Sequence, residues 1–390
     1  MSEARSLSCD VAIAGGGPVG AALALALHAA GVDVVLLEAR DAGNSTQSPH
    51  SPPVLRPLAL SHGSRLIFER LDVWEALTSL TPIERIHVSQ RGRFGRAVLS
   101  AAQARVPALG YVTDYWSLVV ALDAAVRNSG LEVVRGARVT SIAHDETSAR
   151  LEFSTSAGIG DCVASLVAVA DGNAAPTDVG VRTTDYGQSA ITAVVETDAP
   201  HGNTAFERFT PEGPLALLPF GSAYALVWTV HSDLAGDLAG IAPEAFLARL
   251  QERFGERVRF TEVDSRAAQH LTLRVAERVD SGRAVRIGNA AQALHPVAGQ
   301  GFNLGLRDAW ELAIEVERRG PADPMLPPAY AARRRIDRGG GIAFTDALIR
   351  IFSNDFGPLA IARGAGLALL DNLPPAKDFV ARRMIFGSRG

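Results

Sequence analysis

Glycines near the start of the chain have the spacing of a dinucleotide-binding turn. Residues 15–20 read GGGPVG, with glycines at the three positions of a GxGxxG turn where a pyrophosphate must approach the backbone. A helix beginning near Pro18 would point its free N–H groups and positive dipole end at that pyrophosphate. Glu38 then stands where a carboxylate can bind the hydroxyls of an adenosine ribose and repel a 2′-phosphate. The residues of this predicted FAD or NAD site are Gly15, Gly17, Pro18, Val19, Gly20, Glu38 and Ala39.

A second segment, far downstream, separates FAD from NAD. Residues 288–309 read GNAAQALHPVAGQGFNLGLRDA. This segment resembles the second flavin motif of the group A flavoprotein hydroxylases, GDAAH…P…GxGxN…D, and the alternative is an ordinary Gly- and Pro-rich loop entering a helix. The resemblance implies a helix that starts near Gly301 and points its N-terminus at the pyrimidine edge of the flavin, where negative charge accumulates on reduction. It assigns to FAD the residues Gly288, Asn289, Pro296, Gly299, Gly301, Phe302 and Asn303.

Further stretches narrow the resemblance within this family. They are similar to the 2-polyprenyl-6-methoxyphenol hydroxylases of bacterial ubiquinone synthesis. The stretches are residues 86–89, 205–210, 213–219 and 226–228. Asn289 replaces the commoner Asp of the wider family, and its amide oxygen can still accept a hydrogen bond from a ribityl hydroxyl without carrying a charge.

Two motifs of the family match only in part. Asp171 and Gly172 follow an apolar run, and the resemblance places them near the pyrophosphate, although an Asp-Gly pair can also be just a turn. Arg56 begins the segment RPLALS, which resembles the family's RxxALS, where the Arg lies near the flavin. A solvated surface charge is the alternative for Arg56. The Arg that the family often has before a helix is missing, since residues 114–116 read DYW.

In this family the cofactor supplies the chemistry, so no catalytic side chain is assigned. The resemblance implies a bound FAD that takes electrons from NAD(P)H, a transient co-substrate, and activates O₂ to hydroxylate a phenolic ring. The implied substrate is a polyprenyl-methoxyphenol intermediate of ubiquinone biosynthesis. The candidate substrate contacts are Leu218, Phe220, Trp228 and His295. As alternatives, the first three are plain core residues and His295 caps a turn.

Two other functions stay open at this point. Motifs that hold FAD do not encode the reaction, so a reductase or halogenase could use the same scaffold. The WxWxIP signature of halogenases is absent from the sequence. A flavin-retaining assembly subunit of a quinone-biosynthesis complex is the other alternative, because Asn289, Ala175 and the missing Arg depart from the family pattern.

The elements that must position these motifs alternate at the start of the chain. Apolar runs over Cys9–Ala14 and Val32–Glu38, with an Ala- and Leu-rich stretch over Pro18–Ala30 between them, predict a βαβ unit with a parallel sheet. Further expected elements are helices over 59–80, 117–128, 301–319 and beyond 330, a strand over 284–288, and short antiparallel strands over 183–280.

The predicted fold is α/β: a Rossmann-like FAD-binding domain of the para-hydroxybenzoate hydroxylase type, a mainly antiparallel β-sheet substrate domain, and C-terminal helices. The expected divisions are a discontinuous FAD-binding domain over 1–75, 105–182 and 281–335, a substrate domain over 76–104 and 183–280, and a C-terminal helical region over 336–390.

Composition limits the remaining classes. The 390 residues are 47% hydrophobic and carry a net charge of −4, so we expect a folded protein without affinity for nucleic acid. Cys9 and Cys162 stand apart from other metal ligands, and we expect them to be reduced core residues and the protein to hold no metal. No secretory signal or bilayer-spanning apolar run is visible, so we expect a cytoplasmic protein.

Contact with the inner membrane is a further expectation, because a polyprenylated substrate is membrane-borne. Residues 379–386, FVARRMIF, combine apolar and basic side chains and could lie on a membrane surface. A helix docked on its own protein is the alternative. Proteins of quinone biosynthesis are the other expected partners, and the oligomeric state stays open.

Overall fold

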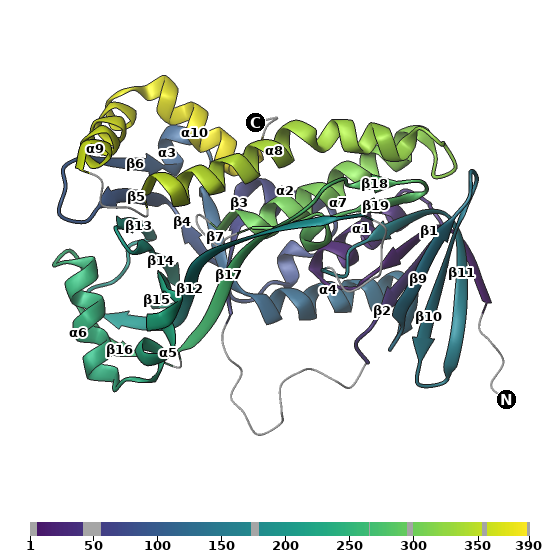
Figure 1. Cartoon of the computed structure of the whole chain (residues 1–390), viewed down its shortest axis with the longest axis horizontal. Helices are drawn as coiled ribbons and strands as arrows, with labels where there is room; N and C mark the ends of the chain where they lie inside the picture. The colour runs from purple at the N-terminus through teal and green to yellow at the C-terminus, as the bar shows by residue number, and fades with distance from the viewer. Residues whose placement is uncertain are drawn as a thin grey trace.

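The computed structural model describes residues 6–41, 56–172, 179–264, 266–294, 299–352 and 357–387. The molecule is elongated, with one large sheet toward each end and helices along one side (Figure 1).

One half of the molecule, called the first half, is built on a mainly parallel sheet. Strand β1 (Ser6–Ala14), helix α1 (Pro18–Ala29) and strand β2 (Val34–Glu38) make the expected βαβ unit, with the two strands parallel. Strand β11 (Gly158–Val169) pairs in parallel with the other side of β1. The other strands of this eight-stranded sheet are β8 (Glu132–Arg135), β9 (Arg138–His144), β10 (Ala149–Thr155), β18 (Asp280–Ser281) and β19 (Ala284–Arg286).

Different structures cover the two faces of this sheet. Helices α1, α4 (Tyr115–Ser129) and α7 (Gln300–Arg319) share one core with the first face. A second core, which includes Phe153, lies on the other face beneath β9 and β10. Cys9 and Cys162 belong to this second core as free thiols, with their sulfurs 3.7 Å apart.

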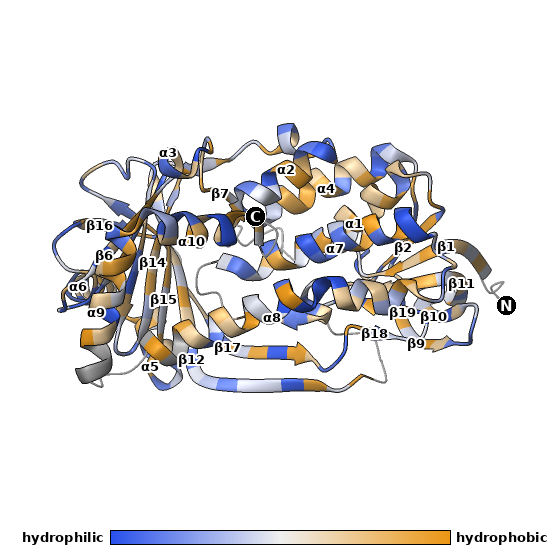
Figure 2. Cartoon of the chain, turned by 90° about the horizontal axis from the view of Figure 1, so that it is seen from above, coloured by the Kyte–Doolittle hydropathy of each residue, from blue (hydrophilic) through white to orange (hydrophobic). Residues whose placement is uncertain are grey.

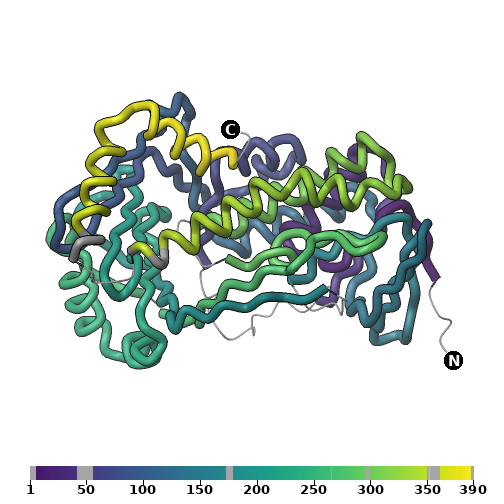
Figure 3. Tube along the Cα trace, turned by 45° about the horizontal axis from the view of Figure 1, so that its top comes forward, coloured from purple at the N-terminus to yellow at the C-terminus, as the bar shows by residue number. Residues whose placement is uncertain are grey.

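The second half is a nine-stranded sheet, antiparallel apart from one pair, as the pattern over 183–280 predicted. Its strands are β5 (Arg85–Gln90), β6 (Arg96–Ser100), β12 (Val181–Thr197), β13 (Thr204–Thr210), β14 (Gly213–Phe220), β15 (Ala223–His231), β16 (Phe260–Val263), β17 (Ala267–Ala276) and β20 (Gln292–Ala293). Strand β17 pairs along its length with the first part of β12, and the two strands run between the two halves (Figure 3). Strands β5 and β6 join the sheet through the parallel pair of β5 with β13. The domain boundaries themselves stay a prediction.

Two helices pack on the second sheet, and three more form the last part of the chain. Helices α5 (Ser232–Gly240) and α6 (Pro243–Phe254) cover one face of the sheet in a core around Phe246. The later helices are α8 (Leu326–Phe352), α9 (Gly357–Asn372) and α10 (Pro374–Phe386). In the described ranges, no helix is both long and apolar enough to cross a membrane.

One expected helix is only partly present. The stretch 59–80 is helical in α2 (His62–Arg70) and in a short 3₁₀ turn, η1 (Trp74–Ala76). Its first residues instead belong to β3 (Pro57–Ser61), which pairs with β7 (Gly110–Asp114) in a three-stranded sheet completed by β4 (Thr81–Ile83). Backbone pairing outweighs local propensity here.

Candidate functional site

The first glycine turn leaves the N-terminus of α1 open. Gly17 precedes the helix without a side-chain cap, and a Cβ on Gly17 would meet no atom within 4 Å. A Cβ on Gly20 would lie 1.9 Å from the carbonyl oxygen of Gly15, so the helix packs directly on the turn. Gly15 has a φ of +109° and approaches the backbone of Asp171. A close helix–strand contact beside an open helix end is the arrangement that a pyrophosphate needs.

Glu38 lies at the carboxyl end of β2, next to this turn. A Cβ on Gly16 would lie 2.6 Å from Glu38 Oε2. Arg40, which sequence reasoning missed, donates from Nε to Glu38 Oε1 at 3.1 Å, and its backbone N–H donates to the same oxygen at 2.8 Å. The hydrogen bond to Glu38 raises the pKa of Arg40. Ala39, between them, is exposed; the basic residue two positions after the acid was the available signal.

Segments far apart in the sequence meet at the same turn (Figure 3). Val19 contacts Gly288, where a Cβ would lie 3.2 Å from Val19 Cγ1. Gly172 has a φ of +71°, and a Cβ on it would lie 4.0 Å from the Cβ of Asn289. Gly305 of α7 packs on Gly288, since its Cβ would lie 2.9 Å from Gly288 Cα. The structure therefore brings together residues of the first, middle and last motifs.

A buried carboxylate on α7, Asp308, holds the turn of the last motif. Its Oδ2 accepts hydrogen bonds from the backbone N–H of Gly288 at 3.1 Å and from Gln292 Nε2 at 2.6 Å. Its Oδ1 accepts from Arg334 Nε at 2.7 Å. Burial acts to lower the pKa of Arg334, but the neighbouring acidic groups, Asp308 first among them, outweigh burial and raise it, so Arg334 stays charged. Arg338 of α8 donates to Gln292 Oε1 at 2.9 Å, so α8 supports this turn through two arginines that the motif did not reveal.

In the described residues, the N-terminus of α7 likewise has no side-chain cap. It begins after Gly299, which has a φ of +58° and provides no side-chain cap. The Asn303 side chain is occupied within the protein: Oδ1 accepts from the backbone N–H of Ser61 at 2.8 Å, and Nδ2 donates to the carbonyl oxygens of Ala59 at 3.0 Å and Gly299 at 2.8 Å. Its amide therefore joins α7 to β3. The backbone N–H groups of the first turn, including that of Gly301, have no acceptor within the helix.

Two neighbouring helices show the contrast. Ser61 Oγ accepts from the N–H of Ser64 and caps α2, and Asp114 accepts from two N–H groups of α4. The ring of Phe302 stacks on that of Phe68, with 6.3 Å between the centroids. The side chain of Phe302 is thus directed into the protein, while its backbone N–H belongs to the first turn of α7. The uncapped ends of α1 and α7 can therefore receive negative charge from a ligand.

Arg56 lies at the start of β3. Its backbone N–H donates to Asp114 Oδ1 at 2.9 Å, and its guanidinium lies over the Tyr115 ring, 4.9 Å from the centroid. The residue is exposed, so its contact with a flavin stays a prediction. His295 and Pro296 lie outside the described residues.

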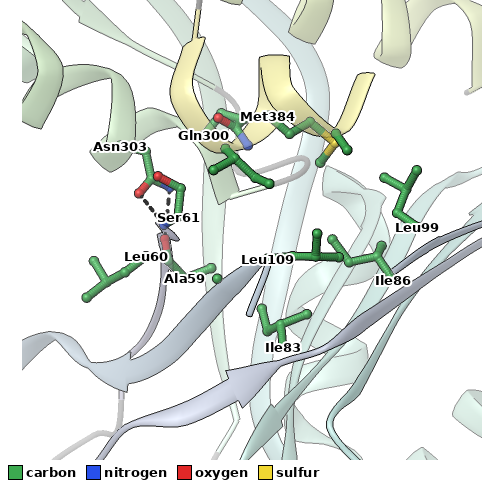
Figure 4. Close-up of a pocket in the computed structure, with 13 residues that line it drawn as sticks. Ala59, Leu60, Ser61, Ile83, Ile86, Leu99, Leu109, Gln300, Asn303 and Met384 are labelled. Atoms are coloured by element: carbon green, nitrogen blue, oxygen red, sulfur yellow. Dashed lines mark hydrogen bonds between the residues drawn. The ribbon is translucent and has the colours of Figure 1, made fainter. Parts of the chain in front are cut away.

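An apolar pocket adjoins the N-terminus of α7 (Figure 4). Its walls come from β3, from Ile83 and Ile86 of β4 and β5, from Leu99 of β6, and from Met384 of α10. Its cavity volume is about 60 Å³, which is below the roughly 300–1,000 Å³ of small-molecule sites, so the lining side chains must move to admit a ring. Sequence reasoning selected Asn303, which also lines this pocket, but none of the four apolar residues, because they lie on separate elements.

The candidate substrate residues fall on two faces of the second sheet. Leu218 and Phe220 pack with Ile83 on the face toward the pocket. Trp228 is 3% exposed on the opposite face, where its ring lies 5.7 Å from that of Phe246. Trp228 is therefore a core residue, as its alternative reading held.

The family described as "FAD binding domain" matches residues 8–337. The chain belongs to this family. FAD is therefore its cofactor, and the structure fits that ligand, because the glycine turn before α1 lies beside Glu38 and contacts the segments around Asp171 and Gly288, and the glycines before α1 and α7 provide no side-chain cap.

Relatives of the family cover nearly the whole chain. The ubiquinone hydroxylase UbiL of Rhodospirillum rubrum is 35% identical over 96% of this chain and 88% of its own. The 3-demethoxyubiquinol 3-hydroxylase of Escherichia coli is 30% identical over 92% of this chain and 93% of its own. The resemblance stated from the motifs is confirmed.

A solved structure confirms the fold. The p-nitrophenol 4-monooxygenase PnpA of Pseudomonas putida has a TM-score of 0.75 to this chain, over 99% of this chain and 100% of its own, at 20% identity. The α/β fold with an antiparallel second sheet and C-terminal helices is thus the fold predicted from the sequence.

Proposed function

We propose that the protein is an FAD-dependent monooxygenase that hydroxylates the phenolic ring of a polyprenyl-methoxyphenol intermediate of ubiquinone biosynthesis. The observation that carries the proposal is the apolar pocket directly beside the open N-terminus of α7. A ring in that pocket would lie against the helix end that belongs to the flavin motif. The names of the two relatives support a ubiquinone precursor as the substrate.

The proposed FAD contacts follow the geometry of the three motifs. The turn over 15–20 and the N-terminus of α1 bind the pyrophosphate, and Glu38 binds the ribose. Asp171 and Gly172 adjoin the pyrophosphate. The amide oxygen of Asn289 accepts a hydrogen bond from a ribityl hydroxyl. The first-turn N–H groups of α7 receive the pyrimidine edge of the flavin. These roles agree with the closeness of Val19, Gly288 and Gly305 in the fold.

When bound, FAD takes electrons from NAD(P)H and activates O₂ for insertion of one oxygen atom into the ring. The protein positions the ring and excludes water. Met384 and Ile385 of α10 line the pocket together with Ile86, so apolar side chains close it on several sides. Water exclusion favours hydroxylation over wasteful formation of H₂O₂.

The protein is also proposed to lie at the inner membrane surface, where such a substrate resides. Half of the exposed large apolar side chains of the described residues lie on the C-terminal helices or, for Leu373, between α9 and α10. They are Ile336, Phe344, Ile351, Ile361, Leu369, Leu373 and Phe379. Figure 2 shows apolar residues among polar ones on α8, α9 and α10. Helix α10 fits both a helix docked on its own protein and a helix at a membrane surface. Ile385 is buried against the protein, whereas Phe379 and Arg382 are exposed.

The test is NAD(P)H oxidation by the FAD-reconstituted protein, with and without a short-chain 6-methoxyphenol analogue, while hydroxylated product and H₂O₂ are measured. Oxidation that depends on the phenol and yields product is expected. Tightly held FAD without oxidation under any phenol would instead favour an assembly subunit, and oxidation without hydroxylated product would favour another flavin oxidoreductase. Proteins of quinone biosynthesis remain proposed partners, testable by adding them to the same assay.

A further inference from the structure

Strand β13 of the second sheet carries one acidic residue, Glu207, on the face of the sheet toward the pocket. Side chains alternate along this strand between the two faces of the sheet. Phe206 points to one face, where its ring lies 5.5 Å from that of Phe254 on α6. Ala205 points to the other face, where it clusters with Ile83 and Val112. Glu207 follows Ala205 by two residues, so it shares the face of Ala205.

The register places Glu207 two residues beyond the pocket wall, on the same face of the sheet. Ala205 pairs with Ile86, which lines the pocket, and Glu207 pairs with Val88 two residues further along β5. The two positions are therefore about 7 Å apart along the strand. On its other side Glu207 pairs with Ala216 of β14. Its immediate neighbours on both strands are uncharged, so the carboxylate interrupts an apolar wall.

Glu207 has no hydrogen-bond or ion-pair partner for its side chain within the part of the chain that the structure describes. The other acid of the same hairpin, Glu212, behaves differently, because Arg253 pairs with it. Glu207 is half-buried, and burial raises its pKa to about 8. A half-buried carboxyl that no protein group satisfies is costly to keep unless a ligand uses it.

Three described charged groups on the covering helices are engaged elsewhere. Asp346 of α8 accepts from the Tyr186 hydroxyl, and Arg363 of α9 donates to the carbonyl oxygen of Ile351. Lys377 of α10 pairs with Asp371 at 2.8 Å. Burial is the cause of the Glu207 shift, and a nearby cation would have lowered the pKa instead.

We propose that Glu207 is the base that accepts the proton of the substrate's phenolic hydroxyl during hydroxylation. This inference rests on the proposed function. The O–H bond breaks, its electron pair stays on the phenolic oxygen, and the proton moves to a carboxylate oxygen of Glu207. The resulting phenolate is richer in electrons at the ring carbon that receives oxygen. The proton returns to the phenolic oxygen once the ring has been hydroxylated, so the step changes no oxidation state.

The raised pKa suits this task. A phenol has a pKa of about 10, so an ordinary carboxylate near 4.3 would be a poor base for it. A carboxylate whose pKa is about 8 is closer to the pKa of the phenol and so a more effective base. Because the base must be ionised, kcat/KM for the phenol should rise as the pH increases through about 8.

The experiment compares the FAD-loaded wild type with Glu207→Gln, Glu207→Asp and the control Glu212→Gln. We expect Glu207→Gln to keep flavin reduction by NAD(P)H but to form hydroxylated product roughly 100-fold more slowly, with more H₂O₂ and without the rise near pH 8. Glu207→Asp should recover part of the rate and the pH dependence. Glu212→Gln should resemble the wild type.

A binding measurement separates this inference from the proposed function. The dissociation constant of an unreactive methoxyphenol, followed by the flavin absorption spectrum, should change with pH in the wild type and lose that change in Glu207→Gln. An unaltered rate and pH profile in Glu207→Gln, beside an active wild type, would overturn the role of Glu207. Failure of the wild type to hydroxylate any phenol would overturn the proposed function itself. If Glu207→Gln does not fold, the profile of Glu207→Asp decides: a profile unchanged from that of the wild type in both rate and inflection overturns the role.

Discussion

At the scale of single residues, the glycines of the first turn differ in why they lack a side chain. Gly20 must be small because a Cβ would lie 1.9 Å from the Gly15 carbonyl oxygen. Gly17 faces open space and has ordinary dihedral angles, φ −63° and ψ 174°. Among the described residues, nothing therefore requires glycine at Gly17. The pyrophosphate proposed to lie at the end of α1 would require it.

This difference predicts that Gly17→Val folds normally but binds FAD weakly. The valine side chain has room in the protein without ligand, whereas it would occupy the space proposed for the pyrophosphate. We expect the dissociation constant for FAD to rise at least tenfold, a loss of about 1.4 kcal/mol, while the Tm of the apoprotein changes little. Fluorescence titration with FAD and thermal unfolding measure the two effects. Gly236→Val is a control, since Gly236 on α5 also faces open space; equal FAD affinity in both variants would contradict the assignment.

The burial of Glu207 predicts that Glu207→Gln stabilises the protein in a pH-dependent way. The carboxyl stays protonated up to about pH 8 in the folded protein, but ionises near 4.5 when unfolded. The folded state thus holds the extra proton between these values, and the free energy of unfolding falls as the pH rises through this window. Gln does not titrate. The full shift corresponds to ~5 kcal/mol, and because Glu207 keeps some solvent contact we expect a gain of about 2 kcal/mol at pH 9 and little at pH 5.

Denaturant unfolding at both pH values measures this gain. Glu212→Gln is the matched control: burial opposes ionisation of Glu212, but hydrogen bonds and Arg253 hold its pKa below the ordinary value. Its replacement should therefore stabilise the protein at neither pH. A pH-independent effect of Glu207→Gln would argue against a buried, titrating carboxyl.

At the scale of elements, α8 acts on the flavin motif although it lies outside it. Arg334 bonds Asp308, and Arg338 bonds Gln292 Oε1 and the carbonyl oxygen of Ala291 at 3.2 Å. The turn of the last motif is thus held between α7 and α8. A helix from the end of the chain thereby fixes the proposed ribityl contact.

Arg338→Ala should therefore weaken both the fold and FAD binding. The substitution leaves the side chain of Gln292 and two buried carbonyl oxygens short of a partner, at a cost of about 1–3 kcal/mol in unfolding free energy. The dissociation constant for FAD should rise roughly tenfold. Arg335→Ala, the exposed neighbour on the same helix, should change neither quantity. An unchanged FAD affinity in Arg338→Ala would show that the turn is rigid without α8.

At the scale of the whole molecule, the pocket exists because the two halves and the C-terminal helices meet. Strand β3 and α7 contribute one wall, the second sheet another, and α10 a third (Figure 4). The long pair β12 and β17 connects the halves (Figure 1). Helix α10 carries both the pocket-lining Met384 and the exposed Phe379, so the face proposed for the membrane adjoins the pocket.

The membrane proposal predicts that Phe379→Ser reduces binding to vesicles of anionic lipid. Phe379 is 68% exposed on α10, and inserting a side chain of this size contributes about 1.5–3 kcal/mol. We expect vesicle affinity to fall roughly tenfold or more, with activity on a short-chain, water-soluble phenol unchanged. Ile159→Ser is the control, because Ile159 is 72% exposed on β11 in the other half. Equal vesicle binding by both variants and the wild type would remove α10 from the membrane contact.

The sequence by itself determined the βαβ unit, the first glycine turn and the flavin motif, because each depends on residues close together in the chain. Residues 15–20 encode the start of α1 and the proposed pyrophosphate contact, and the run over 288–309 encodes the start of α7 and the proposed flavin contact. Spacing and the absence of side chains carry that information locally. The family and its cofactor therefore followed from the sequence.

Only the tertiary structure decided the pocket, the supports of the flavin motif and the placement of Glu207. Asn303 accepts a hydrogen bond from Ser61, which is 242 residues away in the sequence. The stretch 59–61 is a strand because it pairs with β7, which is also distant in the sequence. Trp228 and Leu218 look alike in the sequence, yet strand register puts them on opposite faces. Register, long-range pairing and burial are properties of the assembled fold, and no local pattern contains them.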